Sequence, residues 1–283
     1  MSQKGEFMAR IARGPIVLTL VLAWGALSAA QAPVAQPVLL TPEQMEAFLA
    51  TAKIVRERDA PKGVTDTVRA TLSDGAVTHD AQFQTIDQAK AIFEAGKATE
   101  INFRDTYRYN IAGYRLAQLL GLSTVPMSVQ RRYKGKDAAV TWWIDDVMFD
   151  ESGRMALKNR MGPDPDRTQK QIQVMYVFDE LIQNRDRNQG NLIWTKDWTL
   201  WLIDHTRAFR MGNELLRPER LVRCERALLE RMKALTEASI TETMNGILTR
   251  GEIQPILKRR DLIVQHYEKL IAERGESVVL FSL

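Results

Sequence analysis

Residues 182–191 read IQNRDRNQGN and residues 203–209 read IDHTRAF, and these two segments decide the fold. The first is a polar loop rich in Asn, Asp and Gly, and it follows a segment with helical spacing at 168–182. Two short apolar stretches, 192–195 and 199–203, separate the segments and are typical of strands. We therefore expect Asp186 and Asn191 in a loop and Asp204 at the end of a strand that faces it.

This order of side chains is typical of phosphoryl-transfer sites. In protein kinases, a catalytic-loop aspartate accepts the proton of the attacking hydroxyl, an asparagine five positions later binds a metal ion, and a second aspartate also binds metal. Asp186, Asn191 and Asp204 match that spacing. Amide and carboxylate oxygens suit hard divalent cations, so we expect Mg²⁺ or Mn²⁺ at Asn191 and Asp204.

The loop alone is also compatible with ordinary turn chemistry, in which Asp, Asn and Gly are common. The second segment favours a functional site. There, Leu202 and Ile203 lead the carboxylate of Asp204 to the end of an apolar strand.

Both segments resemble the signature of HipA-type kinases, phosphatidylinositol 3-/4-kinases and secretory-pathway Golgi casein kinases. Residues 63–71 resemble the nucleotide-loop strand of the secretory kinases, residues 109–116 their regulatory helix, and residues 119–126 the turn after it, so the resemblance covers about two-thirds of the chain. It implies an α+β, two-lobed atypical protein-kinase-like fold. The expected boundaries are a small β-rich N-lobe at 41–146 and a larger, mostly helical C-lobe at 147–283.

The same resemblance implies roles for particular residues. Asp186 is the expected catalytic base, Asn191 and Asp204 are the expected metal ligands, and residues 141–146 lead into an adenine-binding hinge. The implied cofactors are Mg²⁺ or Mn²⁺ and ATP or another nucleoside triphosphate. The expected nucleotide-binding positions are Gly63, Arg69, Gln84 and Asn110.

Two of these positions depart from the family pattern. Gln84 stands where the family carries a lysine, and Asn110 stands where its regulatory helix carries a glutamate. Two amides can hydrogen-bond to each other, but they bring no cation to a triphosphate. Arg69, or Lys62 in the preceding turn, could substitute, although the pattern favours a solvated strand-edge or turn charge for each.

Turn residues and apolar spacing predict most elements of the N-lobe. Thr41-Pro42-Glu43-Gln44 combines an N-cap, a proline and a capping-box glutamine, which predicts a helix to about residue 53. The remaining expectations are an antiparallel hairpin of 64–72 with 76–86, a helix at 107–120, and two strands at 125–132 and 138–144. Beyond Pro218 the composition is helical, apart from an apolar tail at 278–281.

The N-terminal segment has the pattern of a secretory signal peptide. Basic residues occur up to Arg13, residues 16–23 are apolar, and Ser28-Ala29-Ala30 supplies small residues for cleavage. We expect residues 1–30 to be a signal peptide, residues 31–40 a leader linker, and the mature protein to be periplasmic or secreted within the cell envelope. If the segment stays uncleaved, it is the expected membrane contact.

The amino-acid composition limits which classes of binding partner and metal site are expected. The chain carries 39 basic and 35 acidic residues, a net charge of +4 without a dense basic stripe, so we expect no nucleic-acid partner. Cys224 is the single cysteine, which excludes an intramolecular disulfide and a thiolate-rich metal site, and we expect it to be buried. The tryptophans between 142 and 201 are expected to fill the core rather than stack on a carbohydrate.

These observations favour a metal-dependent phosphotransferase that moves phosphate from a nucleotide to a protein, lipid or glycan hydroxyl outside the cytoplasm. The missing lysine and glutamate favour an alternative, a pseudokinase that keeps the fold as a binding or allosteric module. A further alternative is a structural envelope protein in which Asp186 and Asp204 are turn residues.

Overall fold

A computed structural model describes residues 40–59, 67–95 and 98–283, which belong to one body spanning residues 39–283. The expected signal peptide, residues 31–39 of the leader, Lys62 and Gly63 lie outside the described residues, so those interpretations stay predictions. Among the described helices, none is both long enough and apolar enough to cross a bilayer.

A five-stranded antiparallel sheet forms most of the N-terminal region. Its strands, in spatial order, are β1 (Lys53–Asp59), β2 (Thr67–Ser73), β3 (Thr78–Gln84), β7 (Lys136–Trp142) and β6 (Ser128–Tyr133). The predicted hairpin is β2–β3 and the two further predicted strands are β6 and β7, so both predictions are confirmed. The sequence pattern did not predict β1, which pairs with β2 along the edge of the sheet.

The sheet has one apolar and one polar face. Ala70, Leu72, Ala81 and Phe83 alternate onto the buried face, and α1 (Pro42–Thr51) packs against β6 and β7. The predicted capping box of α1 is present between Thr41 and Gln44. The opposite face carries the side chains that alternate with this apolar set, including those of Arg69, Gln82 and Gln84. Two of the expected nucleotide-binding residues, Arg69 and Gln84, therefore lie on this polar face.

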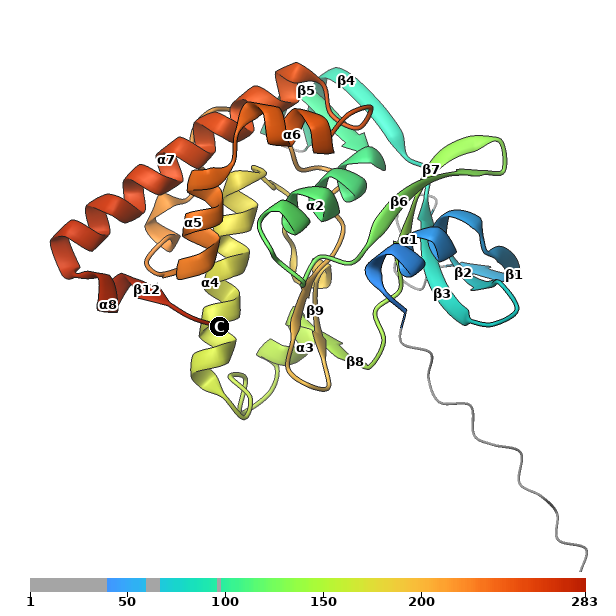
Figure 1. Cartoon of the computed structure of the whole chain (residues 1–283), viewed down its shortest axis with the longest axis horizontal. Helices are drawn as coiled ribbons and strands as arrows, with labels where there is room; N and C mark the ends of the chain where they lie inside the picture. The colour runs from blue at the N-terminus through green and yellow to red at the C-terminus, as the bar shows by residue number, and fades with distance from the viewer. Residues whose placement is uncertain (1–39, 60–66, 96–97) are drawn as a thin grey trace, which may run out of the picture. The chain divides into compact units, whose positions relative to one another are not determined.

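A second hairpin, β4 (Asp87–Ala95) with β5 (Ala98–Thr106), follows the sheet and was not predicted. It projects towards the helical region (Figure 1) and leads directly into α2 (Arg108–Leu119), the predicted helix at 107–120. Ile92 and Ile101 lie opposite each other in the hairpin and are both exposed. In these strands apolar side chains are not confined to a buried face. The alternation of buried apolar and exposed polar residues that identifies a strand in a sequence is therefore missing.

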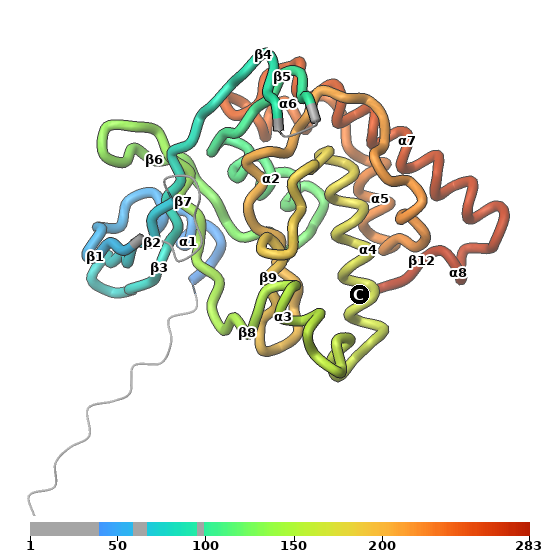
Figure 2. Tube along the Cα trace, turned by 180° about the vertical axis from the view of Figure 1, so that it is seen from behind, coloured from blue at the N-terminus to red at the C-terminus, as the bar shows by residue number. Residues whose placement is uncertain are grey.

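The C-terminal region is mostly helical, and it lies at the opposite end of the body from the five-stranded sheet in both Figure 1 and Figure 2. A small sheet of β8 (Val147–Asp150), β9 (Leu192–Thr195) and β10 (Leu200–Leu202) carries the candidate site. The helices are α3 (Glu151–Met155), α4 (Pro165–Leu181), α5 (Arg226–Ala234), α6 (Glu237–Thr243), α7 (Arg250–Arg274) and α8 (Glu276–Val279). The short strands β11 (Cys224–Glu225) and β12 (Leu280–Phe281) pair in parallel. The expected α+β class, with a β-rich N-terminal and a helical C-terminal region, is confirmed.

The core of the helical region contains a buried cation. Arg259 on α7 is 0% exposed and donates from Nε to the carbonyl of Leu181 at 2.9 Å and from Nη1 to that of Arg210 at 3.0 Å. It also donates to the carbonyl of Gly212. These bonds join α7 to the end of α4 and to the segment that follows the Asp204 strand. Trp194 and Cys224 are also fully buried, as predicted.

Replacing Arg259 by Met should destabilise the protein by about 2–4 kcal/mol, because three carbonyls lose a charged donor inside the core. Urea denaturation followed by circular dichroism measures the change. The matched control is Lys258→Met, one position away on the same helix and exposed, which should change stability by less than about 0.5 kcal/mol. Equal losses in the two variants would contradict the assigned role of Arg259.

Candidate active site

The predicted loop is built by its own side chains. Asn184 Oδ1 accepts a hydrogen bond from the N–H of Asp186 at 3.0 Å. The carbonyl of Asp186 accepts from the Asn188 N–H at 2.8 Å and from Asn191 Nδ2 at 3.2 Å. The five-residue spacing thus lets Asn191 fold back on Asp186. Because the nitrogen is used inside the loop, the amide oxygen is the part of the Asn191 side chain that could act as a ligand.

The neighbouring strands bring Asp204 to the same place. Leu192 pairs with Leu202, and one step further the Ile203 N–H donates to the Asn191 carbonyl at 3.1 Å. Asp204 follows with a φ of 52°, in the left-handed region, and its Oδ1 accepts from Thr206 Oγ1 at 2.9 Å. The structure therefore brings Asn191 and Asp204 to the ends of paired strands, beside the Asp186 loop.

A buried ion pair that the sequence reasoning missed fixes this loop. The Arg187 guanidinium donates to the Asp179 carboxylate of α4 through Nε at 2.9 Å and through Nη2 at 2.9 Å. Its Nη1 donates to the carbonyls of Ile203 at 2.6 Å and Asn191 at 3.2 Å. Both charged side chains are nearly buried, with 8% and 12% exposed. The available signal was an aspartate in a mostly buried helix, eight residues before an arginine in the loop.

Gln84 and Asn110, the two amides among the expected nucleotide-binding positions, contact each other. Asn110 Nδ2 on α2 donates to Gln84 Oε1 on β3 at 2.6 Å, and both side chains are buried. Asn110 Oδ1 accepts from the N–H of His205 at 2.8 Å. A continuous chain of hydrogen bonds thus runs from the sheet, through α2, to the residue after Asp204.

His205 has a packing role next to this chain. The imidazole is 2% exposed and burial lowers its pKa well below the ordinary value, so the ring is neutral near pH 7. Gly113 of α2 lies against it, and a Cβ at Gly113 would come within 3.1 Å of the ring. A side chain at Gly113 would therefore require the imidazole to shift by a few tenths of an ångström.

Arg69 lies on the same polar face of the sheet as Gln84, but its guanidinium has other partners. Nε donates to Asp80 Oδ2 at 2.7 Å, and the group lies 4.0 Å from the centre of the Trp143 ring. Trp143 belongs to the stretch that is expected to lead into the hinge. Asp80 is also bonded to Thr71 and Arg58, so Arg69 is part of a cluster on the sheet face.

A different arginine lies beside the expected base, and sequence reasoning did not single it out. Arg207 Nη1 is 3.4 Å from Asp186 Oδ2, and the guanidinium also contacts Glu100 of β5 at 3.8 Å. It lies 4.9 Å from the ring centre of Phe103. Arg210 Nη2 pairs with the same Glu100 at 2.9 Å. The unpredicted β4–β5 hairpin thus holds a cation against the Asp186 loop.

The hairpin also contributes a carboxylate. Burial raises the pKa of Asp105, and the nearby charges of Asp204 and Asp186 act in the same direction. Asp105 Oδ1 is buried and has no hydrogen-bond partner among the described residues. Such an orphaned oxygen next to Asp204 fits a cation-binding environment.

The residues fit a kinase-type metal site better than a site made by protein ligands alone. Within the described ranges, no three acidic, histidine or cysteine side chains are arranged to hold a metal ion. Asn191 and Asp204 instead offer two hard oxygen ligands, and a Mg²⁺ or Mn²⁺ ion at such a site takes further oxygens from water and nucleotide phosphates.

Several solved structures share this fold. Hydra Fam20, determined with sugar, has a TM-score of 0.66 at 15% identity, over 85% of this chain and 92% of that chain. The Golgi casein kinase with Mn/ADP bound has a TM-score of 0.62 at 13% identity, over 84% of this chain and 78% of that one. The Helicobacter pylori proinflammatory kinase CtkA has a TM-score of 0.53 at 11% identity, over 82% and 98%.

The sequence comparisons add nothing to this list, since no protein-family model and no curated protein matches the chain. The structural likeness shows that the chain has an atypical kinase-like fold, as the sequence resemblance implied.

Replacing Asp105 by Asn should raise the melting temperature of the metal-free protein at pH 7, because it removes a confined negative charge. A raised carboxyl pKa means that stability is lost as pH rises through the folded-state pKa. Well below the ordinary aspartate pKa of about 3.9, the carboxyl is protonated in both states and the gain should vanish. Thermal melts across this pH range measure it. Glu94→Gln, an exposed change on the same hairpin, is the control. A lower melting temperature for Asp105→Asn at pH 7 would refute the interpretation.

Proposed function

We propose that this protein is a metal-dependent phosphotransferase that moves a phosphoryl group from a nucleotide to a hydroxyl acceptor. The observation that carries the proposal is the assembly of Asp186, Asn191 and Asp204 by hydrogen bonds within one loop and two strand ends. The Golgi casein kinase of the same fold has been seen with Mn/ADP, which supports nucleotide and metal binding here.

Each side chain has a proposed role. Asp186 accepts the proton of the attacking hydroxyl, and Asn191 Oδ1 and the Asp204 carboxylate hold Mg²⁺ or Mn²⁺. When bound, the metal neutralises charge on the phosphates. Arg187 keeps the three residues in register, and Asp105 adds negative charge that favours a cation.

The cation that replaces the family's lysine is also part of the proposal. Arg69 is the candidate from the sequence and shares the sheet face of Gln84, but Asp80 and Trp143 already occupy its guanidinium. Arg207 lies next to Asp186, and its Nε is buried without a hydrogen-bond partner in the described ranges. These contacts favour Arg207 as the group that meets the transferred phosphate, as a charge-assisted donor.

The proposal includes the location of the protein and the class of its acceptor. The N-terminal segment supports a periplasmic or secreted protein of the cell envelope. The proposed lobes are residues 41–146 and 147–283. A protein, lipid or glycan could supply the hydroxyl, and the sugar in the hydra Fam20 structure supports a glycan.

One observation favours a second candidate, a pseudokinase. Asn110 donates to Gln84 and accepts from the His205 N–H, so these uncharged side chains form hydrogen bonds without a lysine–glutamate ion pair. A protein that binds nucleotide and transfers nothing would use the same chain of amides to connect the nucleotide face with the Asp204 turn.

ATP with Mn²⁺ should raise the melting temperature of the wild-type protein, because a ligand that binds only the folded state stabilises it by about 2.7 kcal/mol at a hundred times its Kd. Asp204→Ala should abolish this shift, since it removes a metal ligand. Asp186→Ala should keep the shift and lose ATP turnover, because a base acts mainly when the hydroxyl attacks. Differential scanning fluorimetry and a phosphate-transfer assay measure the two properties.

Two results would decide against the enzyme. A nucleotide-dependent shift without turnover towards any protein, lipid or glycan acceptor would support the pseudokinase. The absence of any shift with several nucleotides and metals would reject both candidates.

Arg207→Gln should weaken ATP binding about ten- to a hundredfold, which corresponds to about 1.5–3 kcal/mol for a hydrogen bond to a charged group. Arg69→Gln is the matched comparison and should weaken it much less, because Arg69 is already paired with Asp80. Isothermal titration calorimetry with Mn²⁺ measures both. The reverse order would assign the phosphate contact to Arg69.

A further inference from the structure

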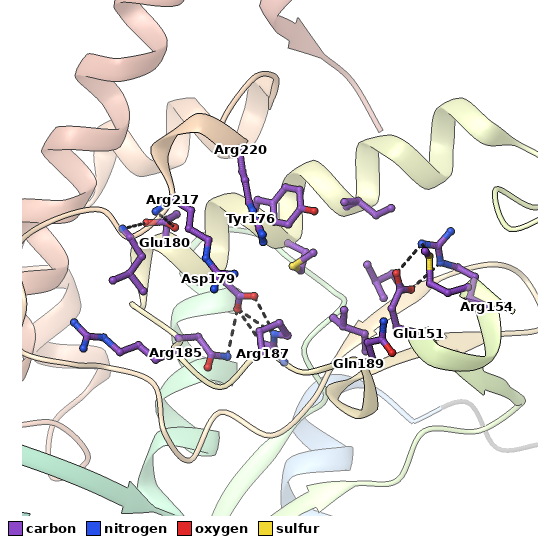
Figure 3. Close-up of a pocket in the computed structure, with 17 residues that line it drawn as sticks. Glu151, Arg154, Tyr176, Asp179, Glu180, Arg185, Arg187, Gln189, Arg217 and Arg220 are labelled. Atoms are coloured by element: carbon purple, nitrogen blue, oxygen red, sulfur yellow. Dashed lines mark hydrogen bonds and ion pairs between the residues drawn. The ribbon is translucent and has the colours of Figure 1, made fainter. Parts of the chain in front are cut away.

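A cavity of about 880 Å³ lies against the catalytic loop, and neither Asp186, Asn191 nor Asp204 lines it. Its walls come from α3, α4, the β9–β10 strands and the segment at 216–220. Figure 3 shows Arg217 and Arg220 extending into it from one side, with Arg187 and Gln189 of the catalytic loop on the other. This volume lies within the range of pockets that bind small molecules.

The three carboxylates in the lining already have partners. Glu151 accepts from Arg154 and from Trp194 Nε1 at 2.8 Å. Asp179 is paired with Arg187. Glu180 accepts from the backbone N–H groups of Leu216 at 2.6 Å and Arg217 at 2.9 Å. Each carboxylate of the cavity therefore already accepts hydrogen bonds from other groups of the protein.

Some of the arginines that line the cavity lack such partners among the described residues. Five arginines line the cavity against three carboxylates. Arg217 and Arg220 are exposed, and within the described ranges neither guanidinium forms an ion pair. Arg220 lies 5.2 Å from the ring centre of Tyr176, which holds it over the cavity. Arg185 pairs with the exposed Glu214 at 3.4 Å. Planar guanidiniums of this kind bind phosphate through paired hydrogen bonds.

Apolar side chains form another part of the lining, and they include Ile172, Met175, Leu192 and Leu200. An apolar wall beside two free guanidiniums suits a molecule with an anionic group and a less polar body. A bare inorganic ion would leave that wall without contacts.

We propose that this cavity is a second binding site that takes a small phosphorylated molecule, with the phosphate on Arg217 and Arg220 and the body against α4. The bound molecule contacts Arg187 and Gln189, which belong to the loop that carries Asp186. The site is separate from the proposed nucleotide and metal centre. A ligand bound in it contacts the loop directly.

Glucose 6-phosphate, orthophosphate and glucose serve as probes in isothermal titration calorimetry. Glucose 6-phosphate should bind wild type, more weakly as NaCl is raised, and more tightly than orthophosphate; glucose should not bind. The variant Arg217→Gln/Arg220→Gln should bind at least about tenfold more weakly, through loss of two charge-assisted contacts.

Two matched controls keep the result specific. Lys258→Gln/Arg274→Gln removes the same charge from exposed positions of α7 and should bind like wild type. Asp204→Ala should also bind like wild type, because Asp204 does not line the cavity, and this separates the site from the proposed catalytic centre. The inference is overturned if glucose 6-phosphate does not bind wild type at millimolar concentration, if both double variants lose binding equally, or if Asp204→Ala loses it.

Discussion

The buried ion pair of Arg187 and Asp179 is the interaction on which the candidate site depends. A guanidinium in such a place costs several kcal/mol in lost hydration, and this cost is offset only when its donors are satisfied. Here a carboxylate and two carbonyls receive them. Because those carbonyls belong to Asn191 and Ile203, one side chain fixes α4, the loop and both strand ends. The position of Asp204 relative to Asn191 therefore follows from the placement of Arg187.

A second constraint connects the sheet to that unit. A lysine–glutamate pair would link β3 to α2 by charge, whereas Gln84 and Asn110 link them by a neutral hydrogen bond that extends to His205. Neutral amides are tolerated in a buried position without a counter-charge. They carry no charge of their own. The β4–β5 hairpin brings a cation to the Asp186 loop, because Glu100 contacts Arg207 next to Asp186.

The Asp186 loop thus has two differently charged sides. Towards Asp204 it presents amide and carboxylate oxygens, together with the raised-pKa carboxyl of Asp105. Towards the cavity it presents Arg185 and Arg187, opposite Arg217 and Arg220. Since Arg187 bonds to residues on both sides, the proposed ligand of the cavity and the proposed metal ion would both contact the same element.

The sequence by itself determined the parts whose signals are local. The Asp186 loop, the capping box at Thr41 and the β6–β7 turn depend on contacts a few residues apart, and their side chains can be read in order along the chain. Only the tertiary structure decided which distant groups complete the site. Asn110 meets His205 across 95 positions, and Glu100, Asp105 and Arg207 meet through a hairpin whose exposed apolar residues hid it from periodicity. Charges that are partners in space leave no spacing rule in a sequence, because their distance is set by packing rather than by the chain.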